Sequence, residues 1–155
     1  MKRFVLLALL MAAPLTGGVS RAAGPEIRKC DFEVKARCAS GEARVTLLDG
    51  LVQRLEVDVD WCAKGGGPGY SCTIDSSRGD ADSRWSQEGG ATIIANAAPF
   101  NGSQPDLVRV TVGRYVSIDL EQAQSLGRCG AGAELPRAIV IPALRGPCRM
   151  WFGKR

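Results

Sequence analysis

LVQRLEVDVDWC, residues 51–62, is the segment that decides the fold of this 155-residue chain. Between residues 54 and 61, apolar and charged side chains alternate without interruption. The apolar positions are Leu55, Val57, Val59 and Trp61, and the charged positions are Arg54, Glu56, Asp58 and Asp60. A period of two places successive side chains on opposite faces of an extended chain. The segment therefore predicts a strand with one face in a core and the other in solvent.

The residues on both sides of this segment extend the β pattern. Asp49-Gly50 directly precedes it, and this pair favours a type I′ hairpin turn because both residues tolerate positive φ. Residues 42–48 are then the partner strand. Residues 30–38 alternate in the same way, and a turn at Ala39-Ser40-Gly41 is expected to end that strand.

The second half of the chain contains further strand candidates and one helix candidate. The predicted strands are residues 70–75, 84–87, 92–97, 107–118, 138–141 and 149–152. A short helix is predicted near residues 119–127, because Asp119 can cap it and Gly127 can end it. The expected fold class is all-β and mainly antiparallel, a small disulfide-linked barrel or sandwich with this one helix.

The chain contains an even number of cysteines, which are Cys30, Cys38, Cys62, Cys72, Cys129 and Cys148. Behind an export signal, such a set indicates a disulfide framework rather than reactive thiols. If residues 30–38 form one extended strand, its ends lie about 26 Å apart, too far for a Cys30–Cys38 bond. Two local pairs, Cys62–Cys72 and Cys129–Cys148, are each plausible, yet together they would force Cys30–Cys38. We therefore expect one of the local pairs to be wrong.

The first residues have the order of a secretory signal peptide. Lys2 and Arg3 precede an apolar run over residues 4–15, and small residues lead to a cleavage site after Ala22. The run of about 12 residues is shorter than the roughly 20 that a bilayer requires. The sequence thus predicts a signal at residues 1–22 and a single β-rich domain at residues 23–155, periplasmic or secreted, with no membrane span after cleavage.

Cleavage would also remove most of the positive charge. The chain has 20 Lys and Arg against 16 Asp and Glu, and three of the cations lie in the signal, which leaves 17 against the same 16. A net charge near +1 does not favour nucleic acid as a partner.

Candidate catalytic groups are few. The chain has no histidine, which removes the commonest general base and metal ligand, and we expect no cofactor and no metal. One acidic strand face, Glu56, Asp58 and Asp60, could supply the paired carboxylates of a glycosidase or oxygen ligands for calcium. The simpler interpretation is a solvated face that pairs with Lys35, Arg37 and Arg44 across the sheet.

These observations predict an exported, non-enzymatic binding protein, either an inhibitor of a secreted hydrolase or a carrier of a small ligand. Its partner would be an unknown protein or small ligand of the cell envelope, contacted through the loops at residues 64–70 and 98–106. Two alternatives stay open: a small carboxylate-dependent hydrolase acting on glycans, and a structural component of the envelope.

Overall fold

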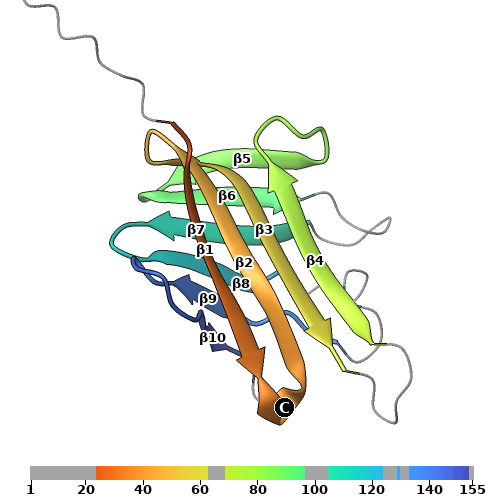
Figure 1. Ribbon diagram of the computed structural model, residues 1–155. Helices are drawn as coiled ribbons and strands as arrows, with labels where there is room; N and C mark the ends of the chain where they lie inside the picture. Colours follow the sequence, from red (N-terminus) through yellow and green to blue (C-terminus); the bar gives the residue numbers. More distant parts are fainter. Residues whose placement is uncertain (1–23, 63–68, 97–104, 124–128, 130–132, 154–155) are drawn as a thin grey trace, which may run out of the picture.

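A computed structural model describes residues 24–62, 69–96, 105–123, 129 and 133–153 of the chain. These residues form antiparallel strands in two sheets (Figure 1). The strands are β1 (Glu26–Val34), β2 (Ala39–Leu48), β3 (Leu51–Trp61), β4 (Tyr70–Ser77), β5 (Ser83–Glu88), β6 (Ala91–Asn96), β7 (Asp106–Val112), β8 (Val116–Gln122), β9 (Ala138–Ile141) and β10 (Arg149–Trp151).

Each sheet is a meander in which consecutive strands are neighbours. The first sheet has the order β1-β2-β3-β4, and the second has the order β10-β9-β8-β7-β6-β5. The two sheets lie face to face, and their strands cross at a steep angle (Figure 1). Because both sheets end in edge strands, the described residues form an open sandwich rather than a closed barrel. The all-β, antiparallel prediction is confirmed.

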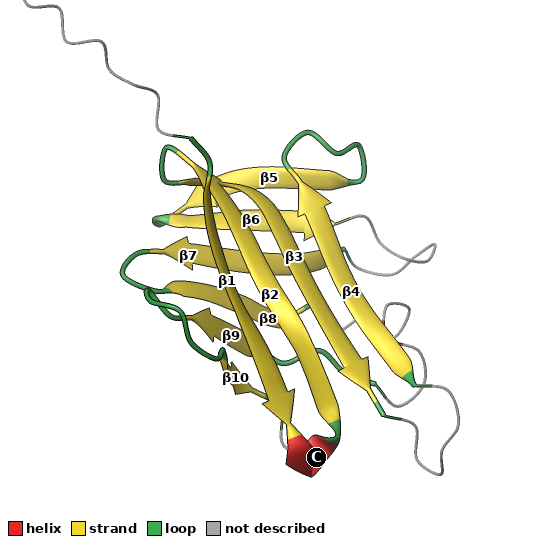
Figure 2. Ribbon diagram, viewed as in Figure 1, coloured by secondary structure: helices red, strands yellow, loops and turns green. Residues whose placement is uncertain are grey.

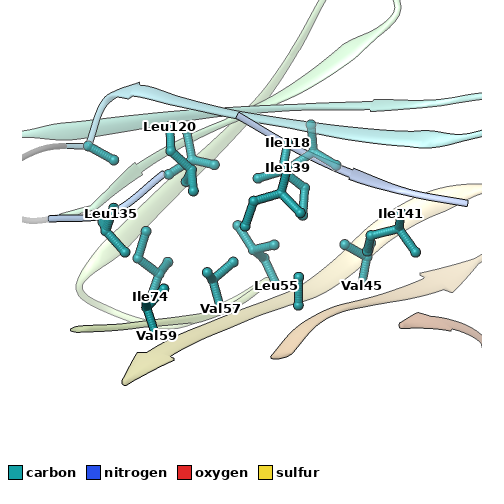
Figure 3. Close-up of a cluster of buried hydrophobic side chains, with 14 of the residues drawn as sticks. Val45, Leu55, Val57, Val59, Ile74, Ile118, Leu120, Leu135, Ile139 and Ile141 are labelled. Carbon is teal, nitrogen blue, oxygen red and sulfur yellow. The ribbon is translucent and has the colours of Figure 1, made fainter. Parts of the chain in front are cut away.

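The space between the sheets is filled with aliphatic side chains from both layers (Figure 3). The inward positions of β3 are those that the alternation predicts, and Leu55, Val57 and Val59 have no exposed surface. From the second sheet and the segment before β9, the cluster receives Ile118, Leu120, Leu135, Ile139 and Ile141. Burial of these side chains is the main source of stability for the sandwich.

The hairpin between β2 and β3 forms as predicted. Asp49 and Gly50 have φ of 51° and 77°, the positive values that a type I′ turn needs at both central positions. An equivalent turn joins β5 to β6, where Gly89 and Gly90 have φ of 55° and 79°.

Three predicted element boundaries are wrong. The first strand ends at Val34, and a short 3-10 helix, η1 (Lys35–Arg37, Figure 2), turns the chain into β2, so Ala39, Ser40 and Gly41 are strand residues. The strand predicted at residues 107–118 is two strands, because the chain reverses at residues 113–115. The helix predicted near residues 119–127 is wrong at its start, since Asp119 to Gln122 continue β8; residues 124–127 lie outside the described residues.

All six cysteines are bonded, which confirms the framework, but neither local pair forms. The bonds are Cys30–Cys148, Cys38–Cys62 and Cys72–Cys129. The expectation that Cys30 and Cys38 do not bond to each other is confirmed. Cys62–Cys72 and Cys129–Cys148 are wrong because each cysteine finds its partner on another part of the sandwich rather than across the nearest loop.

Some predictions fall on parts of the chain that are not described. Residues 1–23, which include the predicted signal, are among them, as are most of the two loops expected to make contacts. The signal and the domain boundaries therefore stay predictions. A disulfide-linked, small all-β fold is nevertheless typical of extracellular proteins.

Candidate functional site

The outer face of the first sheet brings together acidic residues from three strands. Asp31 on β1 lies opposite Glu42 on β2, and Glu42 lies opposite Asp58 on β3. In the next row on the same face, two residues further along each strand, Glu33 and Asp60 lie on either side of Ser40. We call these five carboxylates, Asp31, Glu33, Glu42, Asp58 and Asp60, the acidic patch.

The carboxylates of the patch have few positive partners. Glu42 pairs with Arg44 at 2.7 Å and with Lys29 at 3.7 Å. Asp58 accepts a hydrogen bond from the hydroxyl of Thr73 at 2.8 Å. Within the described part of the chain, Asp31, Glu33 and Asp60 form no ion pair, so the patch carries uncompensated negative charge.

Glu56 does not belong to this patch, although it shares a strand face with Asp58 and Asp60. Its carboxylate pairs with Arg54 at 3.1 Å and with Arg44 at 3.9 Å. Arg54 also donates to Asp75 at 2.9 Å and 3.2 Å, and this hydrogen bond, together with the charges of Asp75 and Glu56, raises the pKa of Arg54. The face predicted as one acidic row is thus divided into a neutralised end at Glu56 and a negative end at Asp58 and Asp60.

The three cations predicted to pair with the acidic face, Lys35, Arg37 and Arg44, differ in their contacts. Arg44 pairs across the sheet with Glu56 at 3.9 Å, as expected, and also with Glu42 on its own strand. Arg37 does not, because its guanidinium bonds to Glu134 and to the carbonyl oxygen of Gly153 and lies 4.7 Å from the centre of the Phe152 ring. Arg37 therefore links η1 to the C-terminal residues instead of pairing with the acidic face. Lys35, the third candidate, is exposed and forms no ion pair with a described residue.

Within the patch, like charges face each other across adjacent strands. Side chains directly opposite each other in antiparallel strands have Cβ atoms about 5 Å apart, and like charges at this distance are destabilising. Asp31, Glu42 and Asp58 make two such contacts in one row. Reasoning from the sequence identified Asp58 and Asp60 but missed Asp31, Glu33 and Glu42, because only the register between strands shows that they are neighbours.

The chemistry that these carboxylates could perform is limited by their surroundings. Asp31, Glu33, Asp58 and Asp60 are all exposed on an outer sheet face, whereas catalytic groups generally line a concave site that can enclose a substrate. Among the described residues, no group of three or more acids or cysteines is arranged to hold a metal ion.

A separate groove of about 360 Å³ runs over the outer face of the second sheet. Its lining includes the apolar residues Ile93 and Leu107 and the charged residues Glu88, Arg109, Asp119 and Glu121. Three acids thus stand against one arginine, and Glu121 is paired with Arg137, so fewer carboxylates gather here than in the acidic patch.

In the described residues, no helix has the length and apolarity needed to cross a membrane. The chain matches no protein-family model, and neither a curated protein nor a solved structure is significantly similar to it. Its function must therefore be argued from the surface itself.

Proposed function

We propose that this protein is an exported, non-enzymatic binding protein whose acidic patch docks onto a cationic partner, most simply a basic secreted hydrolase that it inhibits. The observation that carries the proposal is the row Asp31, Glu42 and Asp58, in which like charges face each other across adjacent strands. Like charges opposite each other are destabilising, and only Glu42 of the three is paired with cations, so a partner that supplies positive charge to Asp31 and Asp58 reduces this cost on binding. Surfaces that trade stability for binding in this way are common at functional sites.

The rigidity of the surface supports this role. Two of the three strands that carry the patch, β2 and β3, are linked by the Cys38–Cys62 bond between the start of β2 and the end of β3. The third strand, β1, is linked by Cys30–Cys148 to the residue directly before β10 of the second sheet. A surface that is already ordered loses little conformational entropy on association. Exposed carboxylates on a fixed sheet also favour fast association through long-range attraction.

Two of the alternative functions, a small-ligand carrier and a glycan hydrolase, have less support. A carrier of a small apolar ligand would need space between the sheets, where Leu55, Ile118 and Ile139 have no exposed surface. A glycan hydrolase would use Asp58 and Asp60, since Glu56 is already paired with two arginines.

A charge-neutralised variant tests the proposal. In Asp31→Asn/Asp58→Asn/Asp60→Asn, binding to a panel of basic secreted hydrolases should be lost, and so should inhibition of the one that the wild type inhibits. The matched control, Asp49→Asn/Asp82→Asn/Glu88→Gln, changes the same number of exposed charges outside the patch and should behave as wild type. Equal loss in both variants, or no binding by the wild type to any basic hydrolase, would contradict the proposal. Glycan turnover that disappears only in the patch variant would favour the hydrolase instead.

A further inference from the structure

The edge of the first sheet that is formed by β1 borders a second surface feature. A cleft of about 730 Å³ lies between residues 27–31 of β1 and residues 142–146 of the loop that follows β9. β1 is the edge strand of its sheet, so one side of its backbone is not paired with another strand (Figure 1).

The orientation of the backbone along this edge can be derived from one hydrogen bond. The amide of Cys148 donates to the carbonyl oxygen of Asp31 at 3.0 Å, so the polar groups of Asp31 point away from β2. In an antiparallel strand the amide and carbonyl of one residue point to the same side, and this side alternates along the chain. The amide and carbonyl groups of Ile27 and Lys29 therefore point into the cleft, and no described residue forms a backbone hydrogen bond with them there.

The side chains around the cleft are mainly cationic and apolar. Arg28, Lys29, Arg44 and Arg145 line it, against the single lining acid Asp31. Three of these cations also pair with acids outside the lining, namely Arg28 with Glu26, Lys29 with Glu42 at 3.7 Å, and Arg44 with Glu42 and Glu56. Arg145 forms no ion pair within the described residues, and the apolar side chains of Ile27 and Leu144 are 57% and 84% exposed. Asp31 lies at the end of the cleft where the edge of β1 is already occupied, because the amide of Cys148 bonds to the carbonyl oxygen of Asp31 there.

We infer that this edge of β1 binds an extended, acidic segment of a partner protein by strand addition. The partner's backbone would complete the hydrogen bonds of Ile27 and Lys29, and its carboxylates would meet Lys29 and Arg145. Ile27 and Leu144 would contact apolar side chains of the same segment. Recognition of this kind takes affinity from the main chain and specificity from alternate side chains. The cleft adjoins the acidic patch, because Asp31 belongs to both and because Lys29 and Arg44 pair with Glu42 of the patch. The inference rests on the free backbone edge of β1 and does not depend on the proposed function.

A second copy of the chain fits this edge less well than an acidic strand. Two copies of β1 paired through their free edges would bring Arg28 and Lys29 of each copy close to the same residues of the other.

Short synthetic peptides test the inference with the full exported protein. An acetylated and amidated peptide in which glutamate and valine alternate should bind, as measured by fluorescence anisotropy at low salt. The same peptide N-methylated at alternate residues keeps its side chains but loses the amides that would pair, and its binding should be lost. A peptide with lysine in place of glutamate should not bind.

Variants then assign the binding to this cleft. Arg145→Glu should weaken binding of the glutamate peptide by about tenfold or more, the loss expected for one charge-assisted contact, whereas Arg149→Glu, an exposed charge on β10, should have little effect. Ile27→Pro removes an amide that is not used within the sheet and should abolish binding, with an unchanged circular dichroism spectrum showing that the fold is intact. Equal binding of the N-methylated or lysine peptide, or no binding of the glutamate peptide to the wild type, would overturn the inference. A dimer in sedimentation experiments that Ile27→Pro dissociates would overturn it as well, because the edge would then be occupied by a second copy.

Discussion

Cys30, in the first strand, is bonded to Cys148, which directly precedes the last strand, and their Cα atoms lie 5.2 Å apart across 118 residues of sequence. The bond therefore joins the two sheets at the side where β1 approaches β9, opposite the side where the chain passes from β4 to β5. The amide of Cys148 and the carbonyl of Asp31 strengthen the same contact. The two sheets are thus joined by the continuous chain between β4 and β5 on one side, and by the Cys30–Cys148 disulfide on the other.

The first prediction concerns how much two of the disulfides, Cys30–Cys148 and Cys38–Cys62, contribute to the free energy of unfolding. A bond that closes a longer loop removes more entropy from the unfolded chain, about 5 kcal/mol for the 118-residue separation of Cys30–Cys148 and about 3.5 kcal/mol for the 24-residue separation of Cys38–Cys62. Replacing Cys30 and Cys148 by alanine should therefore lower the free energy of unfolding more than replacing Cys38 and Cys62, as measured by guanidinium titration. A larger loss in the Cys38→Ala/Cys62→Ala variant would show that strain or residual structure outweighs loop length.

The disulfides also show where reasoning from sequence ends. Alternation along β3 predicted its buried and exposed faces correctly, because that pattern depends only on the strand itself. The bonding of Cys72 to Cys129 depends on how the two sheets lie against each other, and the chain between them gives no local signal for it. The nearest-neighbour pairs failed for this reason.

The same division applies to the turns and to the candidate site. The turn at Asp49-Gly50 was predicted because its residues are typical of a two-residue hairpin. The reversal at residues 113–115 was missed because apolar residues on both sides continue the alternation through it. The acidic patch was found only in the part carried by β3, since Asp31 and Glu42 become neighbours of Asp58 through register alone.

The second prediction concerns Gly41, which pairs with Phe32 in β1 and with Val59 in β3. A Cβ atom at Gly41 would overlap the carbonyl oxygen of Asp58 and lie 2.6 Å from Cζ of Phe32. Gly41→Ala should lower the free energy of unfolding by about 3 kcal/mol, because neither the backbone nor the buried ring can move without disturbing the core. Thermal unfolding measures this loss.

Gly113 is the matched control for Gly41. Its nearest neighbour to a built Cβ is the carbonyl oxygen of Tyr115 at 3.9 Å, an ordinary contact. Gly113→Ala should change the midpoint of unfolding little. A similar loss in both variants would mean that backbone freedom, rather than the space above Gly41, explains the effect.

The third prediction concerns a buried polar contact between the sheets. The hydroxyl of Ser76 in β4 donates to the side-chain oxygen of Asn96 in β6 at 2.7 Å, and both residues are almost fully buried. Ser76→Ala leaves that oxygen without this donor and should cost about 1–3 kcal/mol of stability, the penalty for an unsatisfied buried group. The change should appear as a lower urea midpoint with an unchanged slope. The exposed Ser71→Ala on the same strand should have no comparable effect.

The fourth prediction tests the energetic cost of the acidic patch without any partner. Asp58 lies directly opposite Glu42, whereas Asp60 on the same face lies opposite Ser40 and Ser71, with no acid across from it. Asp58→Asn should therefore stabilise the protein by about 0.5 kcal/mol at low salt, because it removes one like-charge contact, while Asp60→Asn should be close to neutral. Asparagine keeps an oxygen that can accept the hydrogen bond from Thr73, so that contact is not lost in the comparison.

Urea titrations at low and at high salt measure the effect. The difference between the two variants should shrink at high salt, because exposed charges are screened over about 3 Å at 1 M. If Asp58→Asn destabilises the protein at every salt concentration, the row across β1, β2 and β3 is held by attractive contacts, and the argument that it is kept for binding loses its energetic basis.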